Sequence, residues 1–159
     1  MSGPAKKAVH YLPPGRVTRV LNRVVGALTR RGLSMWGSRV LSVPGRTTGI
    51  MRSTPVNVLS LDGEQYLVAA RGTTEWVRNL RAARTGRLTV GRREQWFDGI
   101  EVLDDTRLPV LRAYLRRWGW EVGAYFDGVT ADASDDELRV AAARHPVFRI
   151  VATDPPTAG

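Results

Sequence analysis

The chain has no cysteine and only two histidines, and these shortages exclude several kinds of chemistry. Without cysteine there is no disulfide framework, thiolate nucleophile, iron–sulfur cluster or zinc ribbon. Neither His10 nor His145 has a recognisable nucleophile partner in the sequence, so a triad hydrolase is unsupported. His145 precedes a proline at the end of an expected helix, which is typical of a structural histidine, so we expect no metal site.

Long apolar runs and glycine-rich phosphate loops are also missing. No stretch approaches the roughly 20 apolar residues that cross a bilayer. Lys6 and Lys7 are followed by a polar and proline-rich segment, which interrupts any signal-peptide pattern. No G-x-G-x-x-G or Walker-type loop occurs, and strictly alternating βαβ units are absent, which disfavours a Rossmann domain. Together with the lack of cysteine, these absences predict a cytoplasmic protein.

The charge is strongly one-sided. The 159 residues carry 24 basic and 15 acidic side chains, a formal net charge of +9, and only Lys6 and Lys7 are lysines. Arginine presents a flat fork of donors suited to carboxylate and phosphate, so we expect an anionic partner. The arginines are spread along the chain without a helix-turn-helix, zinc-finger or aromatic-basic signature, so specific nucleic-acid binding is the least favoured reading.

The pattern predicts one domain over residues 16–152, with a flexible arm at 1–15 and a loose tail at 153–159. Apolar residues from Val17 to Leu28 fall on one face of an expected helix over 16–31, with arginines on its flank. Such a helix can lie on an anionic membrane, which would make the protein peripheral, but more often it packs against a core. The sequence leaves both alternatives open.

Short strands dominate the remaining pattern. Asp62-Gly63 separates two apolar runs and predicts a tight hairpin. Asp104 and Asp105 are expected to cap a helix that runs to about Trp118, and Ser134 with Glu137 forms a capping box for another that ends before Pro146. Strands are expected at 39–43, 54–61, 64–70, 87–90, 95–103 and 147–151, with a short helix at 76–83. This mixture predicts an α+β fold with an antiparallel barrel or sheet.

The stretch 44–82 carries the strongest hint of a binding site. Arg46, Thr47 and Thr48 lie in a glycine-flanked turn, and Trp76 and Asn79 lie one turn apart on the expected helix. Guanidinium, hydroxyl, indole and amide groups together suit a ligand with negative groups at one end and a heteroaromatic ring at the other. The alternative at this point is an ordinary turn, surface arginines and a core tryptophan.

Four motifs in this order resemble the deazaflavin-dependent nitroreductase family. They are Gly45-Arg46-x-x-Gly49-x-x-Arg52-x-Thr54-Pro55, Asp62-Gly63-Glu64-x-Tyr66-Leu67-Val68-Ala69-Ala70, Gly72…Trp76-Val77-Arg78-Asn79-Leu80-Arg81-Ala82 and His145-Pro146-Val147-Phe148. The resemblance covers roughly residues 15–152. It implies a split β-barrel of the type that binds FMN or F420, coenzyme F420 as cofactor, and reduction of a quinone, nitroaromatic or similar activated acceptor. The loop between Gly72 and Trp76 is shorter than in relatives with a longer glycine- and proline-rich loop.

The resemblance also implies site residues. Tyr125 is the one candidate for a proton donor, and the aromatic segment 118–128 either walls an acceptor site or fills the barrel. A non-catalytic split barrel that binds a cofactor or lipid-like ligand, and an FMN-dependent protein, remain alternatives, and the acceptor and oligomeric state stay open. The cofactor-binding residues that it implies are Arg46, Thr47, Thr48, Arg52, Thr54, Pro55, Ala69, Ala70, Arg71, Trp76 and Asn79.

Overall fold

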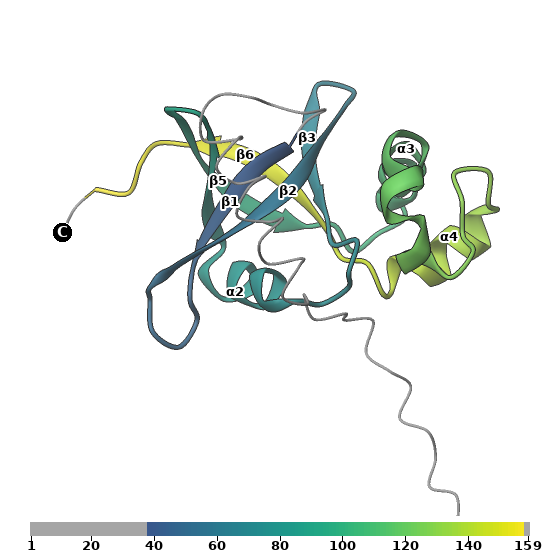
Figure 1. Cartoon of the computed structure of the whole chain (residues 1–159), viewed down its shortest axis with the longest axis horizontal. Coiled ribbons are helices and arrows are strands. Elements are labelled where there is room, and N and C mark those ends of the chain that lie inside the picture. Colours follow the sequence, from purple (N-terminus) through teal and green to yellow (C-terminus); the bar gives the residue numbers. More distant parts are fainter. Residues whose placement is uncertain (1–37, 158–159) are drawn as a thin grey trace, which may run out of the picture.

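The computed structural model describes residues 38–157 and folds them into a closed antiparallel barrel of six strands (Figure 1). The strands are β1 (Ser38–Pro44), β2 (Met51–Leu61), β3 (Glu64–Val68), β4 (Thr85–Val90), β5 (Arg93–Glu101) and β6 (Val147–Thr153). Around the barrel their order is β1-β2-β3-β6-β5-β4, and β4 pairs again with β1. The predicted arm at 1–15 and helix at 16–31 lie outside the described residues.

All six expected strands are confirmed, with shifts at their ends. β2 begins at Met51 rather than Thr54, because Met51 to Ser53 still pair with β1. β3 ends at Val68 rather than Ala70, because the backbone turns there: the Ala70 N–H donates to the Val68 carbonyl at 3.0 Å. The hairpin at Asp62 and Gly63 is also confirmed, and their φ angles of 51° and 77° suit a type I′ turn.

The barrel interior forms one apolar core, closed at one end by α2 (Glu75–Ala83) (Figure 1). Leu67, Phe97 and Phe148 point inward from three strands and are almost fully buried. Val77 and Leu80 of α2 join them with no exposed surface. Helical spacing puts these two side chains on the face that meets the barrel.

A second core lies outside the barrel, where three helical segments cover β2, β3 and β6. They are α3 (Arg107–Val122), the 3₁₀ turn η1 (Gly123–Phe126) and α4 (Asp135–Ala142). Trp118 and Phe126 are 1% exposed in this outer core, so the idea that the aromatic segment fills the barrel is wrong. Trp120 instead points to solvent and is 70% exposed.

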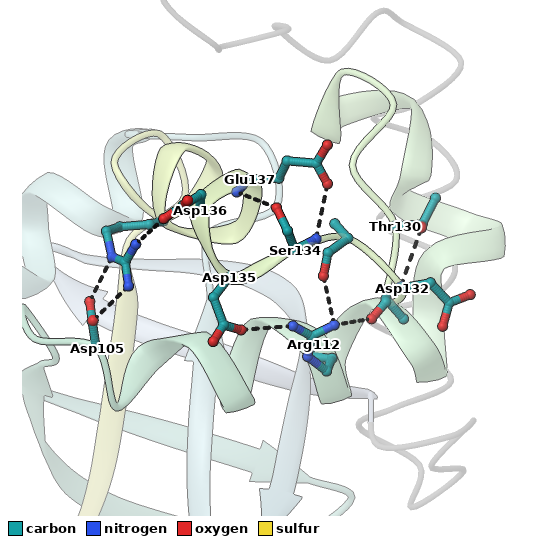
Figure 2. Close-up of polar contacts among 11 residues, drawn as sticks. Asp105, Arg112, Thr130, Asp132, Ser134, Asp135, Asp136 and Glu137 are labelled. Carbon is teal, nitrogen blue, oxygen red and sulfur yellow. Dashed lines mark hydrogen bonds and ion pairs between the residues drawn. The ribbon is translucent and has the colours of Figure 1, made fainter.

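Polar contacts hold α3 and α4 together (Figure 2). Arg112 donates from Nη1 to the carbonyls of Ala131 and Ala133, at 2.7 and 2.8 Å, and pairs with Asp135. The predicted capping box of α4 is confirmed: the Glu137 N–H donates to Ser134 Oγ, and the Ser134 N–H donates to the Glu137 carboxylate. None of the helices in the described part of the chain has the length and apolar content that a bilayer span requires.

The expected cap of α3 is corrected. The N-cap residue is Thr106, and neither Asp104 nor Asp105 caps the helix with its side chain. Asp104 instead accepts hydrogen bonds from the N–H and hydroxyl of Thr106, while Asp105 pairs with Arg139 of α4. The two acidic residues therefore order the turn before α3 and tie it to α4.

The contact between α2 and β5 predicts a matched pair of glycine variants. A Cβ on Gly99 would lie 2.9 Å from Cδ2 of buried Leu80, so we expect Gly99→Ala to destabilise the protein by about 1–3 kcal/mol. A Cβ on Gly119 in α3 meets nothing within 4 Å, so Gly119→Ala should stabilise by about 0.5–1 kcal/mol. Urea unfolding measures both values, and equal effects would contradict the packing of α2 on β5.

Candidate functional site

The turn between β1 and β2 docks on α2 through Asn79, as the sequence had placed these residues near one site. Asn79 is only 3% exposed. Its Oδ1 accepts from the backbone N–H of Arg46 at 3.1 Å and from Nη1 of Arg46 at 2.9 Å. Because a buried amide oxygen is costly to leave without donors, these bonds fix the turn against the helix.

Glu75, in the first turn of α2, bridges two arginines. Its carboxylate lies 2.7 Å from Nη1 of Arg46 and 3.0 Å from Nη1 of Arg78. The hydrogen bond from Arg46, more than any other cause, lowers the pKa of Glu75. All three side chains are largely exposed, so the ion pairs contribute little stability. These contacts do mean that Nη1 of Arg46 is already hydrogen-bonded within the protein.

The turn itself is held by its own backbone. The Gly45 N–H donates to the Ile50 carbonyl at 2.8 Å, and the Gly49 N–H donates to the Gly45 carbonyl at 2.7 Å. Thr48 Oγ1 accepts from the Ile50 N–H at 3.2 Å. Gly49 adopts φ of +72°, which favours glycine. Thr47 and Thr48 are exposed on this turn, next to Arg46 in the sequence.

The register of β1 and β2 divides the strand residues between the two faces of the barrel wall. Arg52 pairs with Val43 and Thr54 with Leu41, so both share the face of the inner core. Pro55 pairs with Val40 and lies on the opposite face. Arg52 and Thr54 therefore share one face of β2, and Pro55 lies on the other face of that strand.

The loop from Ala69 to Thr74 leads from β3 into α2. Arg71 of this loop places its guanidinium 5.6 Å from the centre of the Tyr125 ring in η1, a cation–π contact. Two polar atoms of the loop, Nε of Arg71 and Oγ1 of Thr74, are buried without a hydrogen-bond partner among the described residues. Thr74 is the N-cap residue of α2 but makes no side-chain capping bond.

The expected site residues thus form two groups that the loop 69–74 joins along the chain. Trp76 packs on Phe148 inside the barrel, with ring centres 5.9 Å apart. Ala69 belongs to the inner core, whereas Ala70 packs against the outer one. The group around the turn and α2 contains Arg46, Thr47, Thr48, Arg52, Thr54, Trp76 and Asn79; Ala70, Arg71 and Tyr125 lie on the side of η1, and Pro55 lies on the outer face of β2.

Sequence reasoning missed three residues of this region. Glu75 and Thr74 could have been found from the pattern Thr-Glu-Trp, since a threonine before an acidic first turn is typical of a helix start. His145, which the sequence predicts to be structural, reaches the backbone of Ala69 with its ring. No local pattern signals that contact, because 76 residues separate the two positions.

Metal chemistry has no candidate centre in residues 38–157. No group of three or more His, Asp or Glu side chains there could hold an ion. Of the two buried polar atoms in the loop, Nε of Arg71 is a donor and the Thr74 hydroxyl can donate, which suits an anion.

Comparison with known families gives one match. A family described as F420H(2)-dependent quinone reductase matches residues 16–137. A comparison with the curated proteins gave no match.

Solved structures share the fold at low sequence identity. An F420-H2-dependent reductase, FDR-A, aligns with a TM-score of 0.54 and 17% identity, over 72% of this chain and 94% of that one. A protein described as a domain-swapped dimer aligns with a TM-score of 0.56 and 16% identity, over 85% and 96%. A candidate 5-nitroimidazole antibiotic resistance protein from Bacteroides thetaiotaomicron gives 0.51 and 11%, over 76% and 75%. These likenesses confirm the predicted split barrel.

The docking of the turn on α2 predicts the effect of Asn79→Ala. The change removes the acceptor for two donors of Arg46, one of them the backbone N–H, so we expect a loss of about 1–3 kcal/mol in the free energy of unfolding. The matched control is Arg78→Ala on the exposed face of α2, which breaks only a solvent-exposed ion pair and should change stability by less than about 0.5 kcal/mol. Equal losses in denaturant unfolding would contradict the role of Asn79.

Proposed function

The chain belongs to the F420H2-dependent quinone reductase family, and from this premise we propose how its residues hold coenzyme F420 and what it reduces. The family assignment makes it an F420-dependent reductase rather than a non-catalytic binding protein. We assign the anionic part of the cofactor to the loop 71–74 and the start of α2. The acceptor that we propose is a flat, activated molecule such as a quinone, with a nitroaromatic compound as the alternative.

The observation that carries this assignment is the pair of unsatisfied donors in the loop. A buried donor without a partner costs about 1–3 kcal/mol. Nε of Arg71 and Oγ1 of Thr74 both carry this cost in the protein alone. A phosphate or carboxylate is a suitable acceptor for either group, and the N-terminal end of the nine-residue helix α2 adds a favourable field for negative charge. The residues present therefore fit an anionic group here.

The neighbouring residues suit the rest of such a ligand. Arg46 adds positive charge beside the start of α2, although Glu75 engages its Nη1, and we assign Arg52, on the inner-core face of β2, to the same part of the ligand. Ala69 and Ala70 follow the end of β3, and we assign them to the wall of the ring site, where their small side chains pack into the inner and outer cores. Pro55 lies on the outer face of β2, and we assign it to the edge of the ring site rather than to the anionic part.

When bound, the reduced deazaflavin supplies a hydride. A quinone that gains a hydride also needs one proton to become the hydroquinone. We assign that proton to the Tyr125 phenol, which is half-buried beside Arg71. The protein otherwise orients and desolvates the reactants, because hydride transfer demands close contact more than acid–base chemistry.

Thr74→Val tests whether the loop 71–74 binds the anionic part of F420. It should weaken cofactor binding without lowering the stability of the protein. Valine has nearly the shape of threonine, and the lost hydroxyl has no partner in the protein. We expect unfolding stability to stay constant or rise by up to about 1 kcal/mol, while the Kd for F420 rises about tenfold. Thermal unfolding measures the first effect, and fluorescence titration with oxidised F420 measures the second, with FMN as the control ligand.

The matched control is Thr89→Val in β4, which should leave the F420 Kd unchanged. If the wild-type protein bound FMN but not F420, the cofactor assignment would fail. If the wild-type protein and Thr74→Val bound F420 with the same affinity, the cofactor assignment would hold, and the assignment of its anionic part to the loop 71–74 would fail.

Tyr125→Phe tests the proton donor separately from binding. The variant keeps the ring that Arg71 contacts and loses only the hydroxyl. We expect kcat for quinone reduction to fall about 10²-fold, within the range for a general acid, while the F420 Kd stays constant. An unchanged kcat at saturating F420H2 and quinone would assign the proton to solvent instead.

A further inference from the structure

Ala69, at the end of β3, has both of its backbone groups tied to the segment before β6. Its N–H donates to the Pro146 carbonyl at 2.8 Å. Its carbonyl oxygen accepts from the Gly72 N–H at 3.0 Å and lies 3.0 Å from Nδ1 of His145. Since a carbonyl can only accept, Nδ1 carries the proton. Both lone pairs of this oxygen are thus used, one within the turn 69–72 and one by the imidazole.

The imidazole also contacts η1. His145 is 1% exposed, and its ring stacks on Phe126 with centres 3.9 Å apart and planes inclined by 17°. One side chain therefore joins the turn 69–72 to η1, although the three segments are far apart in the sequence.

The residues of the contact between Arg71 and Tyr125 are next to the two contacts of His145, the bond to Ala69 and the stack on Phe126. Arg71 sits inside the turn that the Ala69 carbonyl closes, and Tyr125 directly precedes Phe126. Loss of the imidazole bond would remove one of the two bonds that tie Ala69 to the segment before β6, and loss of the stack would remove a contact that holds η1 in place. The position of the unsatisfied Nε of Arg71 thus depends on His145 from both sides.

We propose that His145 is a positioning residue for cofactor binding. It holds the turn 69–72 against η1, so that Arg71 meets the anionic part of F420 in a fixed orientation. This inference rests on the function proposed above. His145 acts through Arg71 and does not touch the reacting atoms, so its removal should alter affinity for the cofactor rather than for the acceptor.

Two substitutions separate the functions of the ring. His145→Asn keeps an amide N–H near the place of Nδ1 and should retain the bond to Ala69. His145→Phe keeps an aromatic ring on Phe126 and loses the donor. We expect His145→Phe to raise the F420 Kd and the KM for F420H2 about tenfold with an unchanged KM for the quinone. His145→Asn, which keeps the bond to Ala69 and loses the stack on Phe126, should raise them by a smaller factor, about threefold. If the Phe variant does not fold, His145→Gln replaces it, since its amide lies farther from Ala69.

A double-mutant cycle that combines His145→Phe with Arg71→Ala decides whether His145 acts through Arg71. Non-additive effects are expected for coupled residues, so the double variant should bind F420 no more weakly than Arg71→Ala alone. Arg144→Ala is the control, because it breaks only an exposed ion pair with Asp127 and should leave the Kd unchanged.

The outcomes distinguish the two levels of the proposal. Additive losses in the cycle, or equal F420 affinity in the wild-type protein and in all His145 variants, would overturn the positioning role and leave the cofactor assignment intact. Equal weakening in the Asn and Phe variants would also overturn it, because the donor would then not matter. Failure of the wild-type protein to bind F420 would contradict the proposed function itself.

Discussion

The insertion of β6 between β3 and β5 is the pairing on which the rest of the structure depends. This last strand closes the barrel, with Leu67 paired to Phe148 on one side and Gly99 to Ile150 on the other. Without it, the inner and outer cores would lose Phe148 and Val147, which are almost fully buried on opposite faces of the same strand. It also brings His145 and Pro146 to the end of β3. The pairing of β6 therefore both closes the barrel and brings together the residues of the candidate site.

Separation of the two cores explains why the candidate site lies at the junction of β3, α2 and η1. The inner core needs α2 as its cover, and the outer core needs α3, η1 and α4. The loop 69–74 runs between them, so its polar atoms are shielded from solvent without being absorbed into either core. An anionic ligand that accepts hydrogen bonds from Arg71 and Thr74 would remove the cost of that shielding. Arg46, paired with Glu75 at the start of α2, and Arg71 in the loop supply positive charge near this point.

Local signals in the sequence were sufficient for the elements and insufficient for the contacts between them. The Asp62-Gly63 turn and the Ser134 capping box were predictable because each depends on a few neighbouring residues. The end of β3 and the start of α3 were misplaced, because a turn and a tertiary ion pair decide them. The family pattern placed Arg46 and Asn79 in one site, but their hydrogen bonds to each other and the contact of Arg46 with Glu75 needed the fold. The role of His145 needed the fold, since its partners Ala69 and Phe126 come from separate elements.

The central claim is that the loop 71–74 and the start of α2 receive the anionic part of F420. The most direct test is NMR of the isotope-labelled protein during titration with oxidised F420, with the backbone amides assigned. The account predicts that the largest chemical-shift changes fall on residues 71–77, with smaller ones at Ala69 and Arg46. Saturable binding with changes confined to the outer face of β5 and β6, and none in 71–77, would contradict it.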